Sequence, residues 1–112
     1  MRILTLNEEI LLLAIWRLRE NAYGVTIREK VIDTTGKKIV YGTLYNSLDK
    51  LVKKKYVKTV KGDPTPERGG RSKIFYILTA AGIEALKNTG NLHRTMWHGI
   101  TGLEEGMTSH EQ

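Results

Sequence analysis

The 112-residue chain carries 18 Lys and Arg against 12 Asp and Glu, a net charge of +6, and has no cysteine. This length supports one hydrophobic core, and the lack of cysteine excludes disulfide bonds and thiolate metal sites and fits a reducing compartment. The apolar stretch 10–15 is too short to span a bilayer and the N-terminus has no secretory signal, so we expect a cytoplasmic protein.

Two helices are predicted in the first third of the chain. Thr5 and Glu8 have the spacing of a capping box, with Asn7 as an alternative cap, and apolar residues then recur at helical spacing for about four turns. The turn at residues 21–24 ends this helix. A second helix is predicted from about Val25 to Thr34, ending before Gly36, and residues 37–40 are a candidate for a short first strand.

A third helix is predicted over residues 42–54, and its two faces differ. Leu44, Leu48 and Leu51 fall on one stripe, which we expect to be buried. The opposite face carries small and polar residues, namely Thr43, Asn46, Ser47 and Lys50. Such side chains can meet base edges or phosphates, and this profile is typical of a recognition helix.

Two strands, at residues 56–61 and 73–78, are predicted on either side of a loop that is rich in glycine and arginine. A helix followed by a basic hairpin suggests a winged helix. Glycines beside Arg68 and Arg71 let the backbone approach a duplex closely, as a wing arginine that enters a minor groove requires. The alternative is that both arginines are ordinary solvated loop charges.

Positive charge is concentrated in the middle of the chain. The net charge is zero over residues 1–35, +8 over residues 36–78 and −2 over residues 79–112. The excess therefore lies in the predicted recognition helix and wing, where it can attract a polyanion. A merely solvated basic face is the alternative, but its coincidence with the helix-hairpin pattern favours nucleic-acid binding.

A fourth helix is predicted to begin at its N-cap Thr79. Its apolar seams are too wide for a domain this small to cover, so we expect the same helix of a second subunit to pack on it, with Trp97 near the contact. The residues expected at this interface are Ile83, Leu86, Leu92, Met96, Trp97 and Ile100. Two alternatives remain: Trp97 packs on Leu12 or Trp16 of its own chain, or residues 88–91 kink or end the helix.

Four short motifs resemble the PadR family of bacterial transcriptional regulators, over about residues 4–98. They are Ala22-Tyr23-Gly24, Gly42-Thr43-Leu44-Tyr45, Gly69-Gly70-Arg71-Ser72-Lys73 leading to Phe75-Tyr76, and Leu78-Thr79 with Gly82. The resemblance implies a homodimer that binds a pseudo-palindromic operator, usually as a repressor, relieved in some members by a small ligand. The short C-terminal helix is similar to the smaller subgroup, in which this helix builds the dimer. Paired Trp97 side chains would then frame a slot for a small planar apolar ligand at the dimer interface.

Two positions depart from the family's pattern. Lys55 follows the recognition helix, where members typically have a glycine that reverses the chain, and a left-handed lysine costs about 1 kcal/mol. Asn46 stands where many members have proline, and its amide can pair bidentately with adenine.

The predicted fold is thus α+β, mostly helical: a winged helix-turn-helix domain at residues 1–78, a C-terminal dimerisation helix at 79–100 and a flexible polar tail at 101–112. Ten residues are expected to contact double-stranded DNA: Thr43, Tyr45, Asn46, Ser47, Lys50, Lys53, Lys54, Arg68, Arg71 and Lys73. For Tyr45, burial against the second helix is an equal alternative.

Catalysis and metal binding are not expected. The sequence shows no nucleophile with an evident base and no phosphate-binding glycine loop, and His93 and His98 do not share a helical face. We therefore expect no cofactor. The alternative function is a winged helix that binds another protein instead of an operator, and RNA binding is a third possibility.

Overall fold

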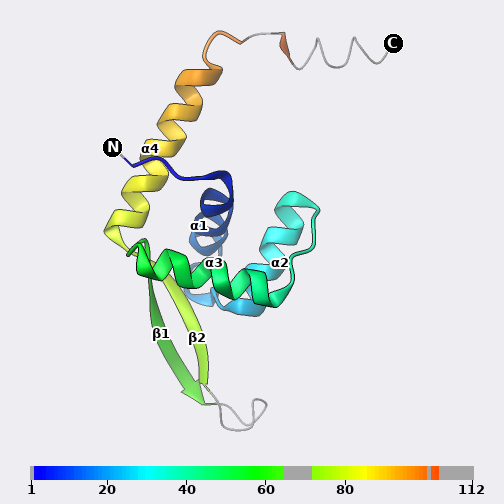
Figure 1. Cartoon of the computed structure of the whole chain (residues 1–112), viewed down its shortest axis with the longest axis vertical. Coiled ribbons are helices and arrows are strands. Elements are labelled where there is room, and N and C mark those ends of the chain that lie inside the picture. Colours follow the sequence, from blue (N-terminus) through cyan, green and yellow to red (C-terminus); the bar gives the residue numbers. More distant parts are fainter. Residues whose placement is uncertain (1, 65–71, 101, 104–112) are drawn as a thin grey trace.

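The computed structural model describes residues 2–64, 72–100 and 102–103. The chain forms α1 (Leu6–Leu18), a 3-10 turn (Arg19–Asn21), α2 (Gly24–Thr35), α3 (Tyr41–Lys53), β1 (Val57–Pro64), β2 (Ser72–Leu78) and α4 (Ala80–Trp97). In Figure 1 the hairpin and α4 project in opposite directions from the bundle of α1, α2 and α3. The predicted α+β winged helix with an added C-terminal helix is confirmed. Arg68, Arg71 and most of the predicted tail lie outside the described residues.

Capping residues mark the start of α1, the end of α2 and the start of α4. Thr5 and Glu8 form the predicted capping box, since the Glu8 N–H donates to Thr5 Oγ1 and the Thr5 N–H donates to Glu8 Oε1. Gly36 ends α2 with φ +72, a left-handed conformation that glycine adopts without strain. Thr79 caps α4 by accepting a hydrogen bond from the Gly82 N–H.

The core lies between α1, α2 and α3 and includes buried residues of both strands and of α4. The three leucines predicted for the inner face of α3 are buried, as are Leu12 and Ile15 of α1. Burying a leucine side chain contributes about 1.5–3 kcal/mol, so this stripe favours an orientation of α3 in which the leucines face inward.

The hairpin differs from its prediction. β1 and β2 pair antiparallel with Val57 opposite Leu78, and β1 reaches Pro64 after an irregularity that begins at Lys61. The short strand predicted at residues 37–40 is wrong, because within the described chain these residues have no regular structure. The edge of β2 is instead covered by residues 22–23: Tyr23 bridges Phe75, and the Tyr76 N–H donates to the Ala22 carbonyl over 2.8 Å.

The C-terminal helix α4 runs through Gly90 without a break, so the helix does not end at residues 88–91, one of the two outcomes considered there. It ends at Trp97, three residues before the predicted limit, because His98 is extended and Gly99 has a φ of +80. Ile100 therefore lies beyond the helix. None of the helices in the described ranges is long and apolar enough to cross a membrane.

Candidate nucleic-acid interface

The outer face of α3 is open. Thr43, Asn46 and Lys50 are exposed and Ser47 is half-buried, while the leucines on the opposite face fill the core. The structure thus brings the four predicted groove-facing residues together on one face of one helix. These side chains include an amide, two hydroxyls and an ammonium, which supply donors and acceptors for base edges and phosphates.

The chain leaves α3 through a left-handed lysine. Lys55 has a φ of 65, its N–H donates to the Val52 carbonyl, and the Tyr56 N–H donates to the Leu51 carbonyl. These two hydrogen bonds and the buried pair Leu51 and Tyr56 make a Schellman motif, in which glycine is usual at the position of Lys55. Lys55, which stands where the family usually has glycine, therefore has the strained left-handed backbone expected at this position.

Lys54, a predicted phosphate contact, already has an anionic partner. Its ammonium forms an ion pair with the Glu8 carboxylate at the start of α1. Partial burial raises the pKa of Glu8, but hydrogen bonds from Lys54 and Thr5 lower it, so that this pKa lies below its ordinary value of 4.5. The same hydrogen bond raises the pKa of Lys54. Lys53, one position earlier, is exposed and has no such partner among the described residues.

Tyr45 is partly packed against α2 and partly exposed, so its position fits both burial and contact with DNA. Its side chain is 42% exposed, yet its ring stacks on that of Tyr41 with centroids 6.2 Å apart. Its hydroxyl lies so close to Gly24 of α2 that a Cβ there would overlap it. Packing on α2 therefore holds the ring, and part of its surface stays open to a ligand.

Arg28 of α2 is absent from the residues predicted for this interface. Its Nε donates to the Ile39 carbonyl over 2.6 Å, and its guanidinium carbon lies 4.9 Å from the centre of the Tyr41 ring. Sequence spacing does not reveal such a residue, because its partners belong to the next helix and the turn before it.

The hairpin of β1 and β2 carries further cations. Lys58 and Lys61 are exposed on β1, whereas the Lys73 ammonium of β2 lies 4.3 Å from the centre of the Tyr23 ring. Lys73 is thus half-buried and oriented by a cation–π contact. Lys58 and Lys61 belong to the basic segment of residues 36–78, but the sequence pattern alone does not distinguish them from its other lysines.

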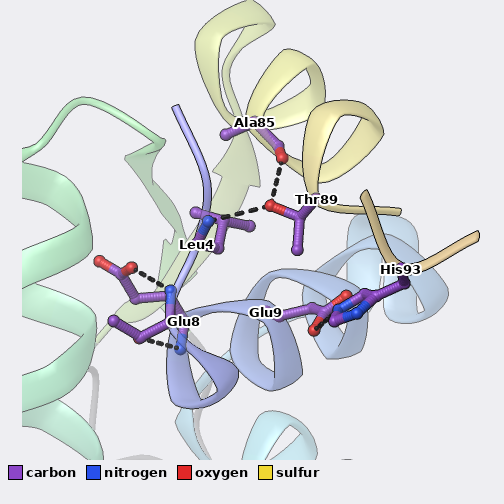
Figure 2. Close-up of polar contacts among 7 residues, drawn as sticks. Leu4, Glu8, Glu9, Ala85, Thr89 and His93 are labelled. Carbon is purple, nitrogen blue, oxygen red and sulfur yellow. Dashed lines mark hydrogen bonds and ion pairs between the residues drawn. The ribbon is translucent and has the colours of Figure 1, made fainter. Parts of the chain in front are cut away.

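The residues predicted for dimerisation fall into two groups. Ile83 and Leu86 are partly buried within the chain, whereas Leu92, Met96, Trp97 and Ile100 are exposed. Trp97 is 56% exposed and Trp16 is 43% exposed, whereas Leu12 is fully buried. Within the exposed group, next to Leu92, His93 Nε2 lies 3.0 Å from Glu9 Oε1 of α1 (Figure 2).

One comparison with known proteins shows the family, and a second shows the fold. The model of the PadR-like family of transcriptional regulators matches residues 12–88. The fold is similar to a PadR-like transcriptional regulator of Bacillus cereus (19% identity, 91% of this chain and 90% of that chain, TM-score 0.65) and to smu.1704 of Streptococcus mutans (29%, 95% and 93%, TM-score 0.65). It is also similar to F93 from STIV, a winged-helix DNA-binding protein (16%, 88% and 98%, TM-score 0.64).

No curated protein matches the sequence. In the described ranges, no three His, Cys, Asp or Glu residues are grouped as a metal ion would require. The family model covers well over half of the chain and describes regulators rather than enzymes. The chain belongs to the PadR-like family of transcriptional regulators.

Proposed function

We propose that this regulator acts in the cytoplasm as a homodimeric repressor that binds a pseudo-palindromic operator in double-stranded DNA. The observation that carries the proposal is the open polar face of α3, with Thr43, Asn46 and Lys50 exposed opposite three buried leucines. In a helix-turn-helix protein such a face enters the major groove. The net charge of +8 over residues 36–78 supports a polyanionic partner.

The roles within the interface follow from side-chain chemistry. Asn46 reads adenine through its amide, with Thr43 and Ser47 beside it. Lys50 faces the major groove with them, Tyr45, Lys53 and Lys54 contact phosphates, and Arg68, Arg71 and Lys73 form the wing, whose arginines enter the minor groove. Because Glu8 neutralises part of the Lys54 charge, we expect Lys53 to contribute more to phosphate binding than Lys54.

The second subunit packs on α4. Leu92, Met96 and Trp97 are exposed near the end of this helix and supply apolar surface for a copy of themselves. Pairing the helices places two α3 helices on two half-sites, so that each subunit raises the effective concentration of the other. The two Trp97 rings would also offer a planar apolar ligand a place to bind and to change the separation of the half-sites.

A salt titration tests DNA binding. We would select the preferred duplex from a random pool and measure its affinity between about 50 and 200 mM salt, with duplex RNA as the comparison. If the dimer neutralises about six phosphates, the log–log slope for DNA is about −5. A slope near zero, or tighter binding of RNA, would contradict the proposal. A protein-binding winged helix is less well supported, because lysine is depleted at the centres of protein interfaces.

A further inference from the structure

The start of α3 has no side-chain cap. Its N-cap is Val40, which makes no capping hydrogen bond, and the first turn has no acidic residue. A polar N-cap contributes about 1 kcal/mol and fixes where a helix begins. The preceding residues 37–40 have no regular structure to fix it instead. The position at which α3 begins must therefore be set by contacts with other parts of the chain.

Arg28 supplies contacts on both sides of Val40. Before the helix, its Nε donates to the Ile39 carbonyl over 2.6 Å, and within the first turn its guanidinium lies on the Tyr41 ring at 4.9 Å. Hydrogen bonding along the guanidinium edge and stacking on its face require a planar group, which arginine has and lysine lacks.

A second contact between α2 and α3, of Tyr45 with Gly24, lies one turn further along both helices. Gly24 and Arg28 lie one turn apart on α2, and Tyr41 and Tyr45 lie one turn apart on α3. Arg28 meets Tyr41, the two tyrosine rings stack at an angle of 23° between their planes, and the Tyr45 hydroxyl lies against Gly24. Contacts at two successive turns resist both sliding and rotation of α3 relative to α2.

The geometry points to Arg28 as a positioning residue that sets the rotation of the recognition helix and so the selectivity for its DNA sequence. This role rests on the proposed function. Side-chain tips lie about 5–6 Å from a helix axis, so a rotation of about 20° moves them by about 2 Å. Hydrogen bonds to bases tolerate only about 0.5 Å of change in length. Asn46 and Thr43 therefore read bases only while α3 keeps its orientation.

The test compares Arg28→Lys, which keeps the charge but loses the planar group, with the wild-type chain. Both are titrated with the selected duplex and with poly(dI-dC). We expect Arg28→Lys to lower the ratio of the two affinities about tenfold, with an unchanged salt slope. Lys30→Met, which removes a charge from α2 two positions away, is the control and should leave the ratio unchanged. An unchanged ratio in Arg28→Lys would overturn the inference.

Two further measurements separate the alternatives. If Arg28 bound a phosphate itself, Arg28→Met would weaken both duplexes equally and reduce the slope by about 1.8, one contact in each subunit, which would overturn the positioning role. Amide hydrogen exchange tests positioning without DNA: the Leu44 N–H, which donates to the Val40 carbonyl, should exchange faster in Arg28→Lys. Unchanged exchange at Leu44 would refute the inference even if the wild-type chain bound no DNA, an outcome that would separately refute the proposed function.

Discussion

The buried hydroxyl of Thr89 accepts a hydrogen bond from the backbone N–H of Leu4 over 2.9 Å and donates one to the Ala85 carbonyl over 2.8 Å (Figure 2). The Thr89 side chain is 1% exposed. This single side chain therefore attaches the segment before α1 to the middle of α4. Residues 88–91, where glycine and asparagine are expected to weaken the helix, thus include the residue that connects α4 to the N-terminal segment.

Replacing Thr89 by Val should destabilise the fold. Valine fills nearly the same space but leaves the buried Leu4 N–H without an acceptor, so we expect the free energy of unfolding to fall by about 1–3 kcal/mol in urea denaturation. Thr89→Ser keeps the hydroxyl and should lose clearly less. Equal stability of the Val variant and the wild-type chain would show that this hydrogen bond contributes nothing.

The ion pair between Glu8 and Lys54 should make stability depend on pH in the acid range. The pKa of Glu8 is lower in the folded chain than its ordinary value of 4.5, so the pair stabilises the fold above about that pH. This contribution is lost as the pH falls through the lower folded pKa. Glu8→Gln keeps a capping side chain but removes the charge, and should cost about 0.5 kcal/mol at neutral pH, because Lys54 is half exposed.

The measurement is urea denaturation at a series of pH values, with the exposed Glu20→Gln as the control. The difference between Glu8→Gln and the wild-type chain should shrink below pH 4.5. A difference that stayed constant down to strongly acid pH would assign the effect to something other than the charge of Glu8.

Lys55→Gly should stabilise the fold, although it removes a side chain. Lys55 has a φ of 65, and glycine relieves a left-handed strain of about 1–2 kcal/mol while costing about 0.5–1 kcal/mol in chain entropy. The net gain of about 0.5–1 kcal/mol is measured by thermal denaturation. Lys53→Gly, the same change in the last turn of α3, should destabilise instead, and a loss in both variants would disprove the strain argument.

Asn46→Ala and Lys53→Ala should separate base reading from phosphate binding. Loss of the amide should cost about 1–3 kcal/mol on the selected duplex and change which sequences are preferred. Loss of the Lys53 ammonium from both subunits should weaken all duplexes alike and reduce the salt slope by about 1.8. The two are compared in binding to the selected duplex and to poly(dI-dC). Uniform loss in both variants would exclude Asn46 as a base reader.

Trp97→Ala should convert the dimer into a monomer at micromolar concentration in sedimentation. Trp97 is more than half exposed in the single chain, and loss of its large apolar surface removes the centre of the proposed interface. Operator affinity should fall with it, because the half-sites are no longer bound together. Val25→Ala truncates an exposed apolar side chain of α2 and should leave the dimer intact. A Trp97→Ala variant that stayed dimeric would place Trp97 outside the interface.

The sequence by itself determined what depends on neighbours within a turn or two. The capping box of Thr5 and Glu8, the cap at Thr79 and the buried leucine stripe of α3 were all predictable. Each follows from local hydrogen bonding or from helical periodicity, which the order of residues encodes directly. The left-handed exit from α3 at Lys55 was instead expected from the resemblance, because glycine is usual at this position in the family.

Only the tertiary structure decided which distant groups meet. Arg28 meets the start of α3, Lys54 pairs with Glu8 and Thr89 binds Leu4, which is 85 positions away. It also decided that residues 22–23, and not a strand at residues 37–40, cover the edge of β2. Such pairings depend on the distances and angles at which elements pack, and spacing along the chain specifies the face of a helix but not the residue that faces it.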